Sequence, residues 1–506
     1  MVSELPRLVV AAPASGHGKT TVATGLMAAL RRTGLEVSGH KVGPDYIDPG
    51  YHALATGRPG RNLDPHLVGE DRIVPLLLNG ARFGGTRGGR PADIAVIEGV
   101  MGLYDGHIGR EGFASTAHVA RLTDSPVVLV VDISHASRTI AATVLGMATF
   151  DPDVRIAGVV LNKAGSVRHS DEVRRALAPL GIPVLGVLQR DDDVTAPSRH
   201  LGLVPAAERP EAARSLDHLA GKVAASIDLE AVMRIARSAP PLRGQAWSAQ
   251  EAVAGGGRGS GGDDDKGRPL IAVAGGRAFT FRYAETVELL EAAGCSVAPF
   301  DPLADEALPD GTAGIYLGGG FPEVHAADLA ANEPMLRALL AATSAGVPTV
   351  AECAGLLYLC RSLDGVPMVG AIDADAAMAP RLTLAYRRST AVADSVLAAA
   401  GTEVTGHEFH RTAVTPAAGA DTEPRPTWQG SGAGPGPGLS ASPAWTSSAG
   451  PEGFVTGSIH ASYLHTHWAG HPALAVRFAE LVRAFAGAPQ PPRRASDRRP
   501  AQLARP

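Results

Sequence analysis

The sequence predicts an α/β protein with two domains, each built on a parallel sheet covered by helices. Short apolar runs rich in β-branched residues alternate with helical stretches, and this alternation occurs in both halves of the chain. A Gly- and Asp-rich stretch near the middle separates the halves. At 506 residues, 45% of them hydrophobic, the chain can bury more than one core, so we expect two α/β domains joined by a linker.

Three segments differ in composition from the two halves. Residues 239–268 combine glycine runs with an acidic run and are predicted to be a flexible linker between a first domain, 1–238, and a second, 269–485. Residues 416–451 alternate Pro, Gly, Ala and Ser and are predicted to be a disordered insertion, as the Pro- and Arg-rich tail, 486–506, is predicted to be disordered. We expect none of them to carry chemistry.

The expected strands are apolar throughout rather than alternating, which suits parallel strands buried on both faces. The first sheet is predicted from residues 8–12, 37–42, 94–97, 127–131, 156–161 and 184–188. The second is predicted from residues 270–274, 296–300, 314–317 and 348–351. A helical stretch at about 284–293 is expected to help form the contact between the domains.

Composition excludes several classes of protein. A net charge of −5 is small for this length and disfavours nucleic-acid binding. The first residues lack a signal-peptide pattern, and no apolar run approaches the roughly twenty residues of a membrane span, so we expect a soluble cytoplasmic protein that does not bind membranes. Three cysteines, Cys295, Cys353 and Cys360, show no zinc spacing and leave at least one thiol unpaired.

A phosphate-binding loop is predicted between the first strand and a helix at 22–32. Backbone N–H groups in such a loop cradle phosphate oxygens, while Lys19 neutralises them and Thr20 reaches Mg²⁺. Pro13 stands where the usual pattern has its first glycine, and a chance glycine-rich turn is the alternative. The predicted ATP-binding residues are Gly16, Gly18, Lys19, Thr20 and Thr21.

Glu98 directly follows the expected strand at 94–97. Open α/β sheets bind ligands at the carboxyl ends of their strands. We therefore expect Glu98 to hold Mg²⁺ together with Thr20.

Cys353 lies between an expected strand and a helical stretch at 356–359, at the tip of a sharp turn. The positive end of a helix dipole and unpaired backbone N–H groups lower the pKa of such a thiol and favour the nucleophilic thiolate. A buried structural cysteine is the alternative.

Motifs in both halves resemble those of the cobyrinic acid a,c-diamide synthases. The resemblance covers roughly residues 7 to 480, in order, apart from the linker and the insertion. Its motifs lie at residues 41–49, 98–106, 200–205, 318–323, 352–355, 406–410 and 462–465. It implies a P-loop NTPase-like domain, similar to dethiobiotin synthetase, followed by a class I glutamine amidotransferase-like domain.

The resemblance implies an enzyme that amidates the a and c side chains of cobyrinate or hydrogenobyrinate in cobalamin biosynthesis. ATP would convert a carboxylate into an acyl phosphate, which ammonia from glutamine would displace. Cys353 would attack the glutamine amide with His465 as base, and backbone N–H groups at Gly318, Gly319 and Gly320 would stabilise the oxyanion. A glycine turn that only reverses the chain is the alternative there.

Loops of the first half are expected to face the corrin ring or the metal. The residues concerned are Asp45, Tyr46, Asp48 and Asp105. For each aspartate the alternative is a turn-forming role, common beside Gly and Pro.

The histidine region departs from related amidotransferases. Those commonly carry a glutamate two residues after the catalytic histidine, but here His467 follows His465 at that spacing. Another group must orient the imidazole. His407 and His410 do not have the spacing of a zinc motif, so we expect a structural or glutamine-site contact rather than a metal.

The sequence is also compatible with other functions. Cobyric acid synthase shares both domain types and acts on other corrin carboxylates, although residues 41–49 favour the a,c-diamide enzyme. A ParA- or MinD-like ATPase switch, or a dethiobiotin-synthetase-like enzyme, would leave Cys353 and His465 without a role. Besides the corrinoid and glutamine, a symmetric homodimer is the default expectation for partners.

Overall fold

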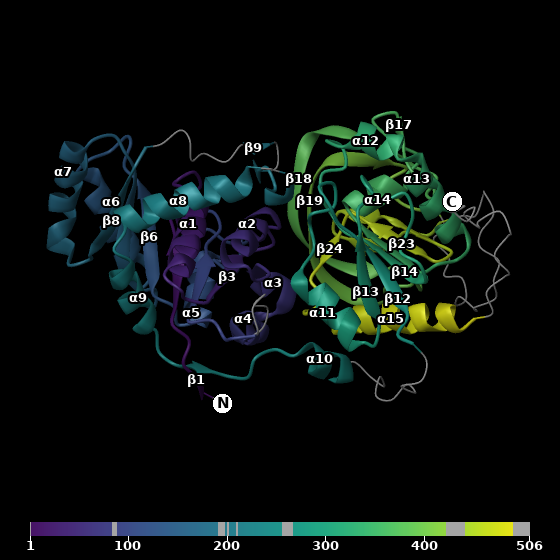
Figure 1. The fold of residues 1–506 in the computed structure, drawn as a ribbon, viewed down its shortest axis with the longest axis horizontal. Helices are drawn as coiled ribbons and strands as arrows, with labels where there is room; N and C mark the ends of the chain where they lie inside the picture. The colour runs from purple at the N-terminus through teal and green to yellow at the C-terminus, as the bar shows by residue number, and fades with distance from the viewer. Residues whose placement is uncertain are drawn as a thin grey trace, which may run out of the picture.

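The computed structural model describes residues 2–82, 89–190, 198–199, 202–208, 211–255, 267–420 and 441–488. It forms two α/β units that lie side by side, the first on the left of Figure 1 and the second on the right. The predicted fold class is confirmed.

The first unit is built on a seven-stranded parallel sheet in the order β4-β3-β5-β2-β6-β7-β8. Its strands are β2 Arg7–Ala11, β3 Val37–Val42, β4 Arg61–Leu63, β5 Ile94–Glu98, β6 Val127–Asp132, β7 Ile156–Ala164 and β8 Val184–Gln189. All six predicted strands are confirmed. The sequence missed β4 because two of its three residues, Arg61 and Asn62, are polar although they are buried.

Helices cover both faces of this sheet. They are α1 Lys19–Arg32, α2 Ile47–Thr56, α3 Pro65–Val68, α4 Ile73–Arg82, α5 Thr116–Leu122, α6 Thr139–Phe150, α7 Val167–Leu177, α8 Ala212–Ser226 and α9 Leu229–Arg237. Short 3₁₀ turns lie at Glu70–Arg72, Ala178–Leu180 and Ala206–Glu208, and β9 Ser198–Arg199 pairs with β10 Gly202–Leu203. Helix α1 packs against α8, as Figure 1 shows, and buries Val22, Leu26 and Met27.

The second unit contains a six-stranded sheet in the order β13-β12-β14-β15-β23-β22, in which only the edge strand β22 is antiparallel. Its strands are β12 Leu270–Ala274, β13 Ser296–Phe300, β14 Thr312–Leu317, β15 Thr349–Glu352, β22 Phe454–Thr456 and β23 Ile459–Ser462. Its helices are α11 Ala284–Ala292, α12 Ala326–Ala331, α13 Glu333–Ser344, α14 Ala354–Leu359 and α15 Pro472–Gly487. The four predicted strands are confirmed.

A second sheet in this unit was not predicted. A long hairpin forms its centre, and the strands are β16 Ser362–Leu363, β17 Val366–Pro367, β18 Asp375–Ala391, β19 Glu403–Thr415, β20 Trp445–Ser447, β21 Gly450–Glu452 and β24 His465–Thr466. Most residues of β18 are partly or fully exposed. Its sequence is neither an apolar run nor a regular alternation of apolar and polar residues. Its stability comes from its pairing along β19, which the sequence pattern does not show.

Ordered elements lie inside two segments that were predicted to be flexible. In the linker range, β11 Leu242–Arg243 pairs with β1 Val2–Ser3, and α10 Ala249–Gly255 packs against α11 and α15. Trp247 and Val253 are buried, which explains why this part is anchored. In the insertion range, β20 and β21 are anchored by the buried Trp445. Residues 256–266, 421–440 and 489–506 lie outside the described residues.

The two units meet through α11, as expected from the sequence, and through the turn between β3 and α2 (Figure 1). Arg61 on β4 pairs with Glu285 at 2.6 Å and with Glu288 at 2.5 Å, and both Arg61 and Glu285 are buried. A hydrogen bond of 2.6 Å from the Tyr386 hydroxyl to Asp64 is a second contact. Buried, hydrogen-bonded charges of this kind fix how the units are docked.

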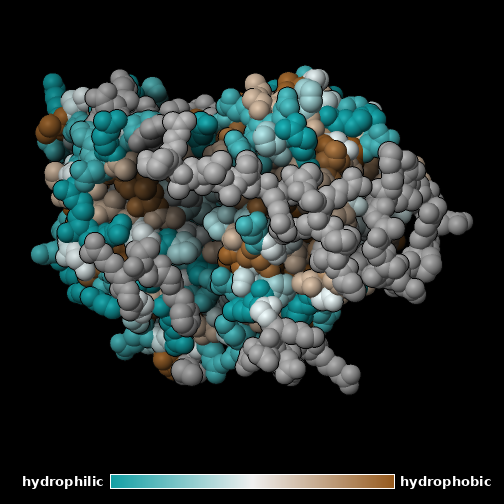
Figure 2. Space-filling view, turned by 45° about the vertical axis from the view of Figure 1, so that its right-hand side comes forward, coloured by the Kyte–Doolittle hydropathy of each residue, from teal (hydrophilic) through white to brown (hydrophobic). Residues whose placement is uncertain are grey.

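Figure 2 shows hydrophilic residues over most of the visible described surface, with hydrophobic residues in several separate areas. Among the helices that the structure describes, none is both long and apolar enough to cross a membrane.

Candidate active site

The predicted phosphate loop connects β2 to α1. Gly16 and Gly18 both have left-handed backbone conformations, with φ of 85° and 89°. A Cβ atom at Gly18 would lie 2.2 Å from the amide nitrogen of Asn162, so only glycine fits there. The Lys19 ammonium donates to the carbonyls of Ala14, at 3.1 Å, and Met101, and so spans the loop. Burial, with Lys41 nearby, lowers the pKa of Lys19 to about 8.

Thr20 and Glu98, predicted from the sequence to hold a metal, lie together. The Thr20 hydroxyl donates to Glu98 Oε1 at 2.6 Å and to Asp48 at 3.3 Å. Lys41 Nζ lies 2.6 Å from Asp48 and 2.9 Å from Glu98, and His52 Nε2 lies 2.6 Å from Glu98 Oε2. The carboxyl ends of β3, β5 and β2 meet here, because these strands are neighbours in a parallel sheet. We call these five residues the carboxylate cluster.

The charged groups of the carboxylate cluster shift one another's pKa values. Burial would raise the pKa of Glu98, but Lys41 and the hydrogen bonds from His52 and Thr20 hold it below its usual range. Burial together with Asp45 and Glu98 raises the pKa of Asp48 well above its usual value. Burial would lower the pKa of Lys41, but the two carboxylates raise it. Two carboxyl groups thus share one ammonium, and the raised pKa of Asp48 favours its neutral, protonated form.

Sequence reasoning missed Lys41 and His52 as members of this cluster. Lys41 lies in the family motif at residues 41–49. A charged lysine in a strand that is buried over its whole length could have indicated that it has a buried partner. His52 lies on α2 and offered no comparable signal.

Two of the predicted substrate residues make hydrogen bonds within turns. Asp45 Oδ1 accepts the Ile47 N–H at 2.7 Å, at the start of α2. Asp105 Oδ2 accepts the Gly102 N–H at 3.0 Å, and the Asp105 N–H donates back to the Gly102 carbonyl at 3.1 Å. These contacts favour the turn-forming alternative for both aspartates.

Cys353 occupies the predicted sharp turn between β15 and α14. Its φ of 49° lies in a region that residues other than glycine rarely adopt, which is typical of nucleophiles at strand-to-helix turns. Its backbone N–H donates to the Ser462 carbonyl at 2.8 Å. This bond ties it to the end of β23, three residues before His465.

The expected lowering of the Cys353 pKa is wrong for this structure. Burial raises the pKa of the thiol, and the neighbouring Glu323 adds to the effect, while the Ala354 N–H opposes it. Cys353 is only 4% exposed, and α14 has six residues, so desolvation outweighs the helix N-terminus. The Ala354 N–H is a backbone donor that contacts the thiol, and sequence reasoning missed it.

His465 is buried on β24, next to its register partner His407 on β19. Its ring stacks on His407 with a centroid distance of 5.0 Å and packs on Tyr46 at 5.1 Å. Burial lowers the pKa of His465 to about 3. No hydrogen-bond partner for His465 Nδ1 is found in the described part of the chain, so no carboxylate orients the ring through this nitrogen.

Glu352 binds the residue after His465. The Thr466 hydroxyl donates to Glu352 Oε1 at 3.1 Å, and the Tyr316 hydroxyl donates to Oε2 at 2.8 Å. Glu352 also directly precedes Cys353. One carboxyl group therefore connects the turn of the nucleophile to the strand of the histidine, and no sequence motif indicated this contact.

The predicted oxyanion glycines Gly318, Gly319 and Gly320 are closely packed, since a Cβ atom at any of them would lie within 2.6 Å of another atom. The Gly319 N–H is donated to the Phe281 carbonyl at 3.1 Å, so it is not free for an oxyanion. A Cβ at Gly319 would lie 2.5 Å from His465 Cε1, and one at Gly320 would lie 2.0 Å from the Ala278 carbonyl oxygen. The Gly318 carbonyl accepts the Gly355 N–H at 3.1 Å. Absence of side chains here lets His465 approach.

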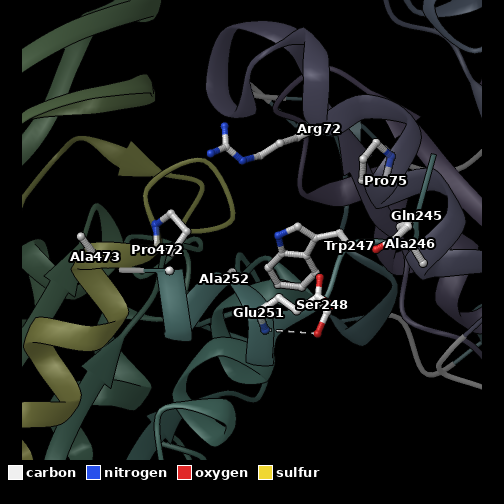
Figure 3. A pocket seen from close by; sticks show the side chains of 11 residues that line it. Arg72, Pro75, Gln245, Ala246, Trp247, Ser248, Glu251, Ala252, Pro472 and Ala473 are labelled. Carbon is white, nitrogen blue, oxygen red and sulfur yellow. Dashed lines mark hydrogen bonds between the residues drawn. The ribbon is translucent and has the colours of Figure 1, made fainter. Parts of the chain in front are cut away.

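A surface cavity of about 600 Å³ lies away from these residues, between α10 and the first turn of α15 (Figure 3). Trp247, Ser248 and Glu251 line it beside Arg72 and Pro472. None of the predicted site residues contributes to it, so it is not the candidate active site.

Comparisons with known proteins match a different domain family to each half of the chain. Residues 8–204 match the CobQ/CobB/MinD/ParA nucleotide binding domain family, and residues 270–473 match the CobB/CobQ-like glutamine amidotransferase domain family. The chain therefore falls in the class of proteins that join a nucleotide-binding domain to a glutamine amidotransferase domain.

Relatives extend over nearly the whole chain. It is 60% identical to the hydrogenobyrinate a,c-diamide synthase of Thermobifida fusca (strain YX), over 94% of this chain and 97% of that protein. It is 52% identical to the enzyme of the same name from Streptomyces coelicolor, over 95% and 98%, and 39% identical to the cobyrinate a,c-diamide synthase of Synechococcus sp., over 94% and 98%. The chain belongs to the hydrogenobyrinate and cobyrinate a,c-diamide synthase family, which confirms the resemblance.

Proposed function

We propose that this protein amidates the a and c carboxylates of hydrogenobyrinate or cobyrinate, using ATP and ammonia released from glutamine. The observation that carries the proposal is the pairing of two sites in one chain: the Lys19 loop with its carboxylate cluster, and the strained turn at Cys353 beside the strand of His465. A nucleotide switch would explain the first site but not the second.

In the first site a corrin carboxylate attacks the γ-phosphorus of ATP. An acyl phosphate forms and ADP leaves, and ammonia then displaces phosphate to give the amide. Lys19 stabilises the charge that develops on the transferring phosphoryl group, because its ammonium sits on the loop and is largely desolvated.

The carboxylate cluster fits Mg²⁺, which would neutralise phosphate oxygens when bound with the nucleotide. Thr20, Asp48 and Glu98 would hold it, since hydroxyl and carboxylate oxygens are the ligands that Mg²⁺ prefers. No group of three or more His, Cys, Asp and Glu side chains among the described residues forms a metal cage. Phosphate oxygens and water would therefore complete the coordination.

In the second site the thiol of Cys353 gives its proton to His465 and attacks the glutamine amide. A γ-glutamyl thioester forms, ammonia leaves with a proton from the imidazole, and water then releases glutamate. Burial raises the pKa of the thiol and lowers that of His465, so both groups rest neutral. Proton transfer would then accompany attack rather than precede it.

The test is product analysis with the full-length protein, ATP, Mg²⁺, glutamine and either hydrogenobyrinate or cobyrinate. We expect mass changes corresponding to one and then two conversions of carboxyl to amide. Omission of ATP should abolish both. An unchanged corrinoid mass with both substrates contradicts the proposal.

A further inference from the structure

Among the described residues, no carboxylate accepts a hydrogen bond from Nδ1 of the His465 ring. Two residues further along the chain lies His467, whose ring stacks on Tyr283 at 4.1 Å and approaches Glu285 at 3.7 Å. The ring contacts of His465 are with His407 from β19 and with Tyr46 from the other domain. One of the two rings that contact this imidazole therefore belongs to the nucleotide-binding domain.

Tyr46 is fixed in place by the domain contact. Its ring is 7% exposed and stacks on Phe281 with a centroid distance of 5.2 Å and an interplanar angle of 8°. On another side it meets His465 at 5.1 Å and 49°. Tyr283, from the amidotransferase domain, lies against it at 4.5 Å.

The turn that carries Tyr46 is itself braced. The Asn62 side-chain amide donates to the carbonyls of Gly43, at 2.8 Å, and Asp45, at 2.7 Å. The same turn leads to Asp48, which pairs with Lys41 in the carboxylate cluster. Tyr46 is thus two residues from Asp48 of the carboxylate cluster and in contact with the predicted glutaminase base.

We propose that Tyr46 is a positioning residue for His465, supplied to the glutaminase site by the nucleotide-binding domain. Tyr46 and His407 together take the place of the glutamate that orients this histidine in related amidotransferases. The inference rests on the proposed role of His465 as the general base. It makes docking of the two domains a condition for full glutamine hydrolysis, and it replaces the expectation that Tyr46 binds the corrin.

The test measures glutamate release by the full-length protein carrying Tyr46→Phe or Tyr46→Leu. Phenylalanine keeps the ring, so Tyr46→Phe should retain kcat within about twofold. Tyr46→Leu should lower kcat at least about tenfold and change the KM for glutamine much less. The reason is that a slightly misplaced base slows the chemical step more than it weakens binding. Amidation with an ammonium salt should persist in both variants. The leucine variant should also react more slowly with 6-diazo-5-oxo-norleucine, an electrophilic glutamine analogue, at Cys353.

Tyr386→Leu is the matched control. Tyr386 is another tyrosine of the same interface, and it bonds Asp64 rather than packing on His465. Equal loss of glutaminase in the Tyr386 and Tyr46 leucine variants would show that only docking matters and would overturn the proposal. So would a Tyr46→Leu variant with normal glutaminase and a raised KM for the corrinoid.

Failure of the underlying function gives a different result. If His465→Ala keeps its glutaminase activity, His465 is not the general base, and the role of Tyr46 no longer matters. Loss of glutaminase in His465→Ala with full glutaminase in Tyr46→Leu would leave the base in place and overturn only the positioning role.

Discussion

At the scale of single residues, the three cysteines of the chain are all buried, yet only Cys353 has a strained backbone and a link to the histidine strand. Cys360 lies at the other end of α14 and donates its S–H to the Leu356 carbonyl at 3.3 Å. Burial raises the pKa of both thiols, so a shifted pKa does not distinguish them. Backbone geometry does.

Cys353→Ala should abolish glutamine-dependent amidation while leaving amidation with ammonium salt within about twofold of wild type, because the acyl phosphate forms in the other domain. Product mass with each nitrogen source checks this. Cys360→Ala is the control and should keep both activities. If ammonium fails to rescue Cys353→Ala, the thiol has a role beyond glutamine hydrolysis.

Lys19→Ala should lose amidation with both nitrogen sources, by at least about a hundredfold, because the ammonium that contacts the phosphoryl group is gone. Glutamate release without corrinoid serves as the internal control for folding and should persist. Amidation that continues with either nitrogen source would contradict the phosphate role of Lys19.

Glu352 should make stability depend on pH. Burial raises its pKa to about 7, from an ordinary value of 4.5, so between these values the folded protein holds a proton that the unfolded chain has lost. This contribution to the free energy of unfolding is full below pH 4.5 and falls as pH rises to 7, by about 3 kcal/mol at most. Urea unfolding measures the free energy of unfolding of both proteins at pH 5 and at pH 8. Between these pH values, the wild type should lose more of this free energy than Glu352→Gln. A difference that does not change with pH would contradict the shift.

At the scale of elements, apolar strands could be predicted from the sequence because parallel strands buried on both faces need no partner pattern to be recognised. The polar β4 could not, since the burial of Arg61 depends on Glu285, more than two hundred residues away. The hairpin of β18 and β19 and the anchored helix α10 were missed for the same reason: tertiary contacts, not local pattern, stabilise them.

The candidate site followed the same rule. Thr20 and Glu98 were predicted to lie together because the carboxyl ends of parallel strands meet at one edge. A glycine, in contrast, indicates only that a side chain would not fit at that position, and not which neighbour occupies the space. For Gly319 the sequence could not show that this space is for His465 rather than for an oxyanion.

Gly319→Ala should therefore impair glutaminase through the position of His465. The new Cβ would lie 2.5 Å from His465 Cε1, closer than such atoms approach, so the ring must move. We expect a fall in kcat for glutamate release of at least about tenfold, with ammonium-dependent amidation kept. Gly146→Ala is the control, because nothing lies within 4 Å of that position in helix α6, and it should leave both activities unchanged. Normal glutaminase in Gly319→Ala would mean that the ring has room to shift without loss.

At the scale of the whole molecule, two reactions depend on one interface. In the proposed reaction, ammonia must pass from the Cys353 site to the Lys19 site before it is protonated or lost. The turn of Tyr46 contacts His465 and leads to Asp48 of the carboxylate cluster. A tightly docked interface would favour transfer over escape. The number of amides formed per glutamine hydrolysed measures this directly.

Arg61→Ala should lower that ratio. It leaves Glu285 buried without its cation, which costs about 3–5 kcal/mol and loosens the docking of the domains. Ammonium-dependent amidation should change less, because free ammonia needs no protected path.

Glu288→Gln weakens the same contact more mildly and should give a smaller fall in this ratio, since Glu288 is partly exposed. Arg121→Ala, which breaks the pair with Asp151 within the first domain, should leave the ratio at the wild-type value. An unchanged ratio in Arg61→Ala, in protein shown by thermal unfolding to be folded, would mean that the interface does not retain ammonia.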